Sequence, residues 1–527
     1  MDASPPHDPL LELSAAELAR QIARGELSSA EATERYLARI AAIEPQVHAV
    51  AIPLYDQARQ EAAQADVRRA AGESLPPLHG VPITIKECFH LAGTPSCIGL
   101  AHLRDELLPA DGTLVSRLRR AGGIVLAKTN LPQIMIWHEC DNPVYGRTNN
   151  PWDLARTPGG STGGEAALIA ARGSPLGLGN DLGGSIRVPA HFSGIHGLMT
   201  TSFLLPRSGS RRTLRGMEGV ISRSGPLARH VEDLDLALRV LADASDGRSE
   251  PDTQLAPLAS PRDVKLKGLK IACWTDDGYF PASRAIVRAV REAAEALAAR
   301  GAIVEEIKPD WTGEAMEIYF GLLGADGGAG ARRLSEGSQL DWRVRRIRTV
   351  AGMNRSLRHA VVAGLRLAGQ RWMAAVTVEA RPRSADEYWQ LIDRRNAFVR
   401  RWLSDMQQAG YQAFLSPPHA LPAPQHQRAI DLIPAAGYAM VPNLLGIPAG
   451  VFSISRVRAG EETGRTFARD TAERQAAATD AGSAGLPIGV QIAALHWRED
   501  IILAIMSALE EDFSQRDDYP LRAWVPA

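Results

Sequence analysis

Short apolar runs alternate with helical stretches along most of the chain. Runs rich in β-branched residues predict strands at 81–85, 124–127, 269–274, 303–307, 450–454 and 488–493. Apolar residues at helical spacing predict helices at 114–121, at 286–299 and from about residue 500. This alternation favours an α/β fold, in which helices cover the faces of a sheet.

Two helix-start signals open the chain. Ser14 stands three residues before Glu17, Ser28 stands three residues before Glu31, and apolar residues at helical spacing follow each pair. The first residues to about 71 are therefore predicted to form two or three helices. Further along, the segment from about 312 to 402 is rich in helical spacing and in arginine, which favours a solvated helical cap over a membrane-facing surface.

Charge and composition exclude several classes of protein. The 527 residues hold 59 Lys plus Arg against 60 Asp plus Glu, a net charge of -1. A partner such as nucleic acid or an anionic membrane would require a basic excess, so neither is expected. Only 6 of the 59 basic residues are lysines, which draws attention to a lysine inside an apolar run because lysine, unlike arginine, can lose its proton.

The cysteines and the first residues point to a reduced, cytoplasmic protein. The four cysteines form no CxxC pair, and no two histidines have metal-ligand spacing, so no metal site is expected. The first 18 residues lack the basic start of a signal peptide, and no window holds 18 apolar residues. We therefore expect a cytoplasmic protein without a transmembrane anchor.

Twelve glycines lie between residues 141 and 197, concentrated in PGGSTGG at 158–164 and GLGNDLGGSIRVP at 177–189. A dinucleotide-binding loop fits poorly, because the spacing is G-x-G-x-x-x-G. A nucleophile elbow around Ser161 would need a strand immediately before the serine, whereas the preceding residues resemble a loop. The glycines therefore indicate tight turns, but neither of these two motifs explains both blocks.

A third interpretation joins both glycine blocks to Lys86, which ends the apolar run VPITIK. A serine hydroxyl needs a base, and a lysine buried in a strand would have a lowered pKa and could serve as one. Ser185 follows two glycines and precedes an expected helix start, so backbone amides there could face a developing oxyanion. Ser161 could carry a proton between Ser185 and Lys86.

The motifs resemble those of the amidase signature family over nearly the whole chain. The residues that carry the resemblance are GVPITIKE around Lys86, the linker at 129–152, the block at 159–198, PPHALPAPQH at 417–426, NLLGIPAG at 443–450 and GLPIGVQIAA at 485–494. Glu165 and the sequence PLGLGNDLGGSIR are most similar to the branch of fatty acid amide hydrolases and acetamidases.

The resemblance implies a role for each matching residue. Ser185 is similar to the acylated nucleophile, Ser161 to the bridging serine that follows a cis peptide bond, and Lys86 to the general base. The amides of Leu182, Gly183, Gly184 and Ser185 match the oxyanion hole. Substrate-binding positions are expected at Met135, Trp137 and Thr162, because 134–137 is an apolar stretch and Thr162 stands where a second serine is usual.

The expected fold is that of the family: a large mixed, twisted sheet covered by helices on both faces, with a helix-rich cap insertion. One domain, 1–527, is expected, with amino-terminal helices at 1–72, a catalytic core at 73–245, the cap at about 312–410 and a return to the sheet at 411–527. The family resemblance implies no cofactor and no metal, a small-molecule amide as partner, no nucleic acid, and leaves a homodimer open.

The expected activity is hydrolysis of carboxylic acid amides to an acid and an amine or ammonia. The apolar stretch at 134–137 favours aryl or alkyl amides, and the same relay could act on esters or carbamates. Two alternatives stand beside it: a glutamine-hydrolysing subunit of a tRNA-dependent amidotransferase, and a non-catalytic binding protein on the same scaffold.

Overall fold

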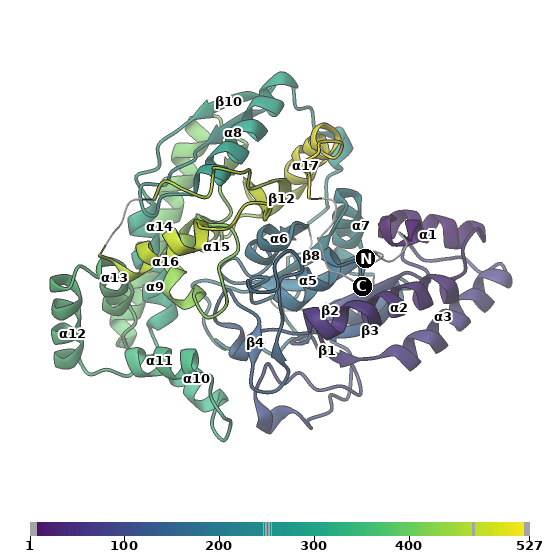
Figure 1. Cartoon of the computed structure of the whole chain (residues 1–527), viewed down its shortest axis with the longest axis horizontal. Helices are drawn as coiled ribbons and strands as arrows, with labels where there is room; N and C mark the ends of the chain where they lie inside the picture. Colours follow the sequence, from purple (N-terminus) through teal and green to yellow (C-terminus); the bar gives the residue numbers. More distant parts are fainter. Residues whose placement is uncertain are drawn as a thin grey trace.

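An eleven-stranded mixed sheet organises the chain (Figure 1). The computed structural model describes residues 8–520 apart from 246, 248, 249, 251, 252, 255 and 466–468. In spatial order the strands are β1 (Val50–Pro53), β3 (Ile124–Thr129), β2 (Pro82–Lys86), β6 (Leu176–Asp181), β8 (Arg223–Ala228), β7 (His196–Met199), β12 (Ala449–Arg456), β13 (Pro487–Ala494), β11 (Ala413–Ser416), β9 (Lys270–Cys273) and β10 (Ile303–Glu306).

Parallel and antiparallel pairs share this sheet. Strand β2 runs parallel to both β3 and β6, and β9 runs parallel to β10 and β11, whereas the other neighbouring pairs are antiparallel. Central strands are buried along their whole length, as expected of strands covered on both faces. The prediction of an α/β fold built on a large mixed sheet is confirmed.

Helices precede the first strand and separate most of the later strands along the chain. Outside the cap they are α1 (Ala15–Arg24), α2 (Ser29–Val47), α3 (Tyr55–Ala70), α4 (Thr113–Arg120), α5 (Gly163–Ala170), α6 (Arg187–Ser193), α7 (Val231–Ala242), α8 (Arg284–Ala299), α15 (Gly437–Leu445), α16 (Thr471–Asp480) and α17 (Glu499–Phe513). The predicted starts of α1 and α2 are confirmed, because the Ser14 and Ser28 hydroxyls accept hydrogen bonds from the amides of Glu17 and Glu31. The edge strand β1 between α2 and α3 was not predicted.

The central strand β6 was not predicted either, because two of its residues are glycines, which have low strand propensity. Both are required by packing. A Cβ atom at Gly177 would lie 2.0 Å from the Glu165 side chain, and one at Gly179 would lie 2.7 Å from that of Thr162. Helix α5, which carries Glu165 and is wholly buried, can therefore pack closely on the strand.

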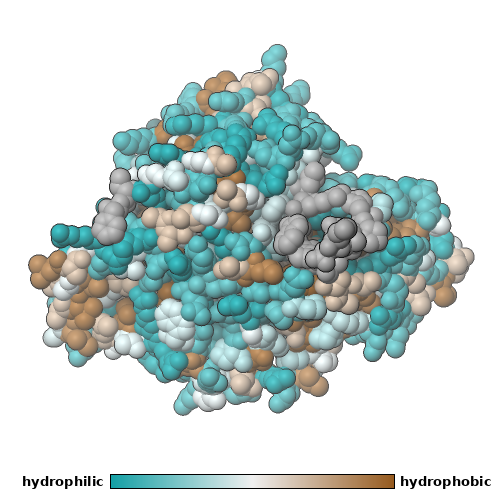
Figure 2. Space-filling view, viewed as in Figure 1, coloured by the Kyte–Doolittle hydropathy of each residue, from teal (hydrophilic) through white to brown (hydrophobic). Residues whose placement is uncertain are grey.

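Six helices fill residues 312–408: α9 (Thr312–Gly324), α10 (Ala329–Leu334), α11 (Trp342–Ala351), α12 (Arg355–Leu367), α13 (Arg371–Glu379) and α14 (Ala385–Gln408). Figure 1 shows α10 to α13 at the opposite end of the molecule from α1 and α3. A hydrophobic surface lies at this end in Figure 2, where α12 leaves Leu357 and Leu367 51% and 90% exposed. Among the described helices, none is long and apolar enough to cross a membrane.

A buried arginine joins this group of helices to the loop at 137–141. Arg343 of α11 is 1% exposed, and its guanidinium forms ion pairs with Glu139 at 2.6 Å, with Asp341 at 2.8 Å and with Asp141. Burial raises the pKa of Glu139 to about 7 even with this counter-charge present. Since Glu139 also accepts the amides of Gln427 and Ala429, the ion pairs tie three distant segments together.

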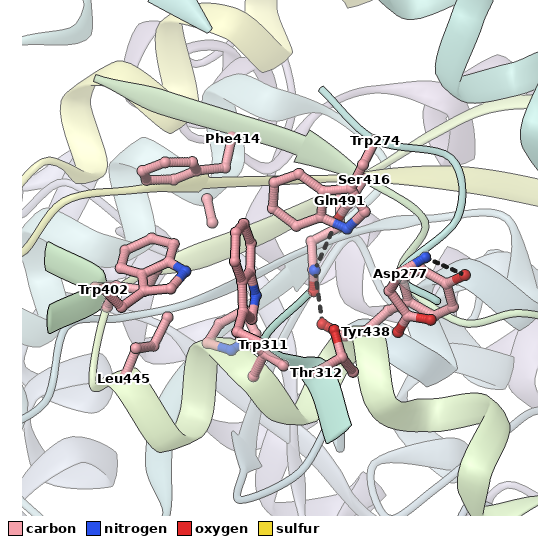
Figure 3. Close-up of a pocket in the computed structure, with 14 residues that line it drawn as sticks. Trp274, Asp277, Trp311, Thr312, Trp402, Phe414, Ser416, Tyr438, Leu445 and Gln491 are labelled. Carbon is pink, nitrogen blue, oxygen red and sulfur yellow. Dashed lines mark hydrogen bonds between the residues drawn. The ribbon is translucent and has the colours of Figure 1, made fainter. Parts of the chain in front are cut away.

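An aromatic-walled cavity lies against helix α15, which contributes Tyr438 and Leu445 to its lining (Figure 3). In the wall of this cavity Trp311 lies between Trp274 and Trp402, edge to face with each, at centroid distances of 6.1 and 6.2 Å. Asp277, 4% exposed, is the one acid that lines it among the described residues. Its Oδ1 accepts two backbone amides, but its Oδ2 has no partner in the described part of the chain.

Replacing Arg343 by Ala should strip the counter-charge from Glu139 and Asp141 while both carboxyls remain buried. Loss of one partner from a buried ion pair typically costs about 3–5 kcal/mol, so the urea midpoint should fall sharply. Arg345→Ala, on the exposed side of the same helix, is the matched control and should change the free energy of unfolding by less than about 0.5 kcal/mol. Equal losses in the two variants would contradict a role for the buried pairs.

Burial raises the pKa of Asp277 to about 7. The folded protein therefore holds this proton more tightly than the unfolded chain does, and stability is lost as the pH rises from about 4 to about 7. Asp277→Asn removes that loss, so between pH 5 and pH 8 the variant should gain about 2–3 kcal/mol relative to the parent protein. Urea denaturation at both pH values measures this gain, and Asp276→Asn, at the exposed neighbour, should show none.

Candidate active site

Lys86 is the last residue of β2, and its amine is fully buried between β2, β6 and the loop before α5. Its Nζ donates hydrogen bonds to Ser161 Oγ at 2.6 Å, to Asn180 Oδ1 at 2.7 Å and to Thr162 Oγ1 at 3.1 Å. Burial lowers the pKa of Lys86 to about 8. At pH 7 about a tenth of this amine is therefore unprotonated, which is the form that can act as a base, and the fraction rises to about half near pH 8.

Ser161 follows a cis peptide bond from Gly160, as the family resemblance implies. Only a glycine fits before it, because a Cβ atom at Gly160 would lie 2.2 Å from the carbonyl oxygen of Glu139 and 2.5 Å from that of Trp137. The hydroxyl of Ser161 lies against the buried amine. Sequence spacing alone could not place these two groups, which are 75 residues apart.

Ser185 lies in the turn that joins β6 to α6. The turn requires a glycine at position 184, where φ is +106°. The Ser185 carbonyl accepts the Thr162 amide at 3.1 Å, so the segment that carries Ser185 contacts the segment that carries Ser161. Both serine side chains line one cavity. Between their two hydroxyls the described structure records no direct hydrogen bond.

The four backbone amides from residue 182 to residue 185 differ in whether they already have a hydrogen-bond acceptor. The Gly184 amide donates to Asp181 Oδ1 at 2.7 Å and is therefore already occupied. The amides of Leu182, Gly183 and Ser185 have no hydrogen-bond acceptor within the part of the chain described. Of the four amides expected to face an oxyanion, three are thus free to donate, and that of Gly184 supports the turn.

A buried ion pair holds the turn in place. Arg187, at the start of α6, contacts Asp181 at 3.0 Å, and it also donates to Gln491 at 2.6 Å and Asn443 at 2.5 Å. Burial alone would raise the pKa of Asp181, but the Arg187 guanidinium and the Ile186 and Gly184 amides lower it well below its usual range. Asp181 therefore stays ionised and continues to accept hydrogen bonds from the amides of the turn.

Two side chains from distant segments support the same turn and were not predicted to do so. Tyr319 of α9 donates to the Leu182 carbonyl at 3.1 Å, and His138 Nε2 lies 3.0 Å from the Gly183 carbonyl. Burial lowers the pKa of His138 to about 4, so the neutral ring donates its Nε2 proton to that carbonyl. Asn180, the second acceptor of the Lys86 amine, was also missed, although it stands inside the second glycine block.

Glu165 is buried beneath the site rather than in it. Its carboxyl accepts a 2.7 Å hydrogen bond from Thr129 and a short one from Thr84. Burial raises the pKa of Glu165 to about 7. In the described residues, no group of three or more His, Cys, Asp or Glu side chains is arranged to hold a metal ion.

The cavity in front of the two serines has a largely apolar wall. It is lined by Ile134, Met135, Ile136, Leu214, Met217 and Val220, and it holds about 570 Å³ of empty space that opens to solvent. Met135 thus lies at the cavity, as expected. Thr162 contacts the Lys86 amine. The buried Trp137 packs against Arg343, whose guanidinium carbon lies 4.7 Å from the centre of the Trp137 ring.

Comparison with known proteins agrees with this geometry. The family model described as Amidase matches residues 31–503. Fatty-acid amide hydrolase 1 of Sus scrofa is 32% identical over 510 residues, which cover 95% of this chain and 86% of that protein. A solved structure of a fatty acid amide hydrolase superposes with a TM-score of 0.83 at 25% identity, over 97% of this chain and 86% of that one.

A component of a glutamyl-tRNA(Gln) amidotransferase matches a shorter part of the chain. This relative, from Thermobifida fusca (strain YX), is 37% identical over 317 residues, which cover 59% of this chain and 62% of that protein. The match therefore does not extend over the whole of either protein.

Proposed function

The chain belongs to the amidase family and hydrolyses amides, and we propose that it does so through an acyl-enzyme on Ser185, with Ser161 as proton relay and Lys86 as general base. The observation that carries the proposal is the 2.6 Å contact between the Lys86 amine and the Ser161 hydroxyl, beside a cavity that Ser161 shares with Ser185. Full-length similarity to fatty-acid amide hydrolase 1, against partial similarity to an amidotransferase component, supports a free-standing hydrolase.

The hydrogen bonds around Lys86 favour its action as a base. A neutral amine has two N–H groups and one lone pair. Asn180 Oδ1 can only accept and takes one N–H, and Thr162 Oγ1, which itself donates to the Asn180 carbonyl, takes the other. In this neutral form the contact with Ser161 reverses direction: the Ser161 hydroxyl donates its proton to the lone pair of Nζ, whereas the charged ammonium donates to Ser161.

Acylation begins when Ser185 Oγ attacks the amide carbon and its proton passes through Ser161 to Lys86. The carbonyl oxygen becomes an oxyanion, which the free amides of Leu182, Gly183 and Ser185 can stabilise. We assign the oxyanion hole to these three amides and give the Gly184 amide a supporting role, since Asp181 already accepts it.

The tetrahedral adduct collapses by breaking its C–N bond. The leaving nitrogen must be protonated first, and the Lys86 ammonium supplies that proton through Ser161. Water then attacks the Ser185 ester, giving a proton to the same relay, and the free acid leaves as Ser185 recovers its proton. The apolar wall around Met135 favours aryl or alkyl amides, and esters or carbamates can pass through the same steps.

A fluorophosphonate probe tests the nucleophile. The purified chain, with no partner added, should hydrolyse a 4-nitroanilide and be labelled by the probe. Ser185→Ala should abolish both, whereas Ser222→Ala, at another serine of the same cavity, should retain labelling. Labelling that survives Ser185→Ala would overturn the assignment, and activity seen only with glutamine and a partner chain would favour a role within an amidotransferase.

The pH profile tests the base. Because Lys86 must be neutral and its pKa is about 8, kcat/KM for the anilide should rise with pH and level off a little above pH 8. Lys86→Arg should be inactive at every pH, since arginine stays protonated. Lys86→Ala should slow the anilide far more than the matched 4-nitrophenyl ester, whose leaving group needs no proton. Equal losses on both substrates would contradict the role of Lys86 in protonating the amine.

A further inference from the structure

The loop between β7 and β8 brings two arginines to the wall of the catalytic cavity. Arg207 and Arg212 line it together with Ser161 and Ser185, whereas no aspartate or glutamate does so among the described residues. The cavity is otherwise apolar or uncharged apart from the Lys86 amine behind Ser161. Its wall therefore carries an excess of positive charge, which an uncharged alkyl or aryl amide would not use.

Arg212 is held in position by its neighbours. The Arg211 amide donates a 2.8 Å hydrogen bond to the carbonyl of Cys88, which follows Lys86 by two residues. The Thr213 hydroxyl donates to the Ile134 carbonyl. The residues on either side of Arg212 are thus bound to the two segments that border the proposed reacting groups, Arg211 through its backbone amide and Thr213 through its side chain. Arg212 is therefore part of the cavity wall and does not lie on an unattached surface loop.

The two arginines differ in what they contact. Arg207 pairs with Glu218 at 3.1 Å, but that glutamate is 58% exposed, so solvent screens the pair. The half-buried Arg212 forms no ion pair and donates no hydrogen bond to any residue that the structure describes. A partly desolvated guanidinium without an acceptor is poised to bind a planar anion through two parallel hydrogen bonds.

We propose that the preferred substrate is an amide that also carries a carboxylate, and that Arg212 binds this carboxylate, with Arg207 adding to the positive field. The inference rests on the proposed function, because it concerns the same cavity. Apolar side chains such as Met135, Leu214 and Met217 would contact the hydrocarbon that separates the carboxylate from the scissile amide. Arg212 is thus a substrate-binding residue that sets specificity.

Paired substrates test this proposal. One series compares 4-nitroanilides of dicarboxylic acid monoamides with those of monocarboxylic acids of equal chain length, which places the charge on the acyl side. A second compares anilides that carry a ring carboxylate with their ring-methyl counterparts, which places it on the amine side. The parent enzyme should prefer the carboxylate in at least one series, through a lower KM.

Arg212→Gln should reduce that preference, the ratio of kcat/KM for the charged and neutral members, by about tenfold or more, as expected for loss of a charged hydrogen-bonded contact. Arg212→Lys should restore part of it, and Arg212→Glu should reverse it. Arg215→Gln, at the exposed arginine three residues further along the same loop, is the matched control and should leave the preference as it was.

Two results overturn the inference. One is a parent enzyme with no preference for the carboxylate in either series, and the other is an equal loss on charged and neutral members in Arg212→Gln. Hydrolysis of neutral anilides that depends on Ser185 would still stand in both cases. Failure of the proposed function is seen separately, as an enzyme that hydrolyses no anilide of either kind.

Discussion

The burial of the Lys86 amine is the constraint on which the rest of the site depends. Because this amine is buried at the end of a strand, out of contact with water, its pKa is lowered. The groups that accept its N–H hydrogens then determine the direction of the lone pair of the neutral amine. Asn180 and Thr162 leave that lone pair to Ser161. The strand order places β2 directly beside β6, and β6 carries Asn180 and leads into the Ser185 turn. One pair of adjacent strands thus brings the proposed base and the proposed nucleophile together.

Close packing explains why so much glycine surrounds this amine. Gly160 passes between two carbonyl oxygens, and Gly177 leaves room for the Glu165 carboxyl against β6. Next to Ser185, Gly184 adopts a backbone conformation that residues with side chains disfavour, and the buried Asp181–Arg187 ion pair stabilises this turn. The glycines therefore allow close approach of backbone or of side chains to the strand and loops around the proposed site, and neither a phosphate nor a dinucleotide is needed to account for them.

Charge is distributed unevenly around the centre. Acids near the site are either paired with arginine, as Asp181 and Glu139 are, or buried under hydroxyl groups, as Glu165 is. The cavity itself is lined by arginine, with no acid among the described residues of its wall. The aromatic-walled cavity beside α15 has the opposite arrangement: among the described residues that line it, Asp277 is the one carboxyl and lies among tryptophans, and none of the proposed catalytic groups is included (Figure 3).

Local pattern in the sequence determined the α/β class, most strands at 81–127 and 269–307, and the helix starts at Ser14 and Ser28. Through the family motifs, the sequence also led to the proposal that Lys86, Ser161 and Ser185 are the reacting groups. It could not reveal β6, whose glycines are explained only by the side chains of α5. Apolar patterning without the family motifs could not separate Lys86 from Lys128, since both lie in buried apolar strands and burial lowers the pKa of each to about 8. Lys128 contacts Ser96 and the Pro95 carbonyl, and only Lys86 faces the serines. Three features depend on contacts between residues far apart in the sequence or on acceptors already taken: which buried amine contacts Ser161, which amides remain free, and which arginines line the cavity. Tertiary structure alone decides them.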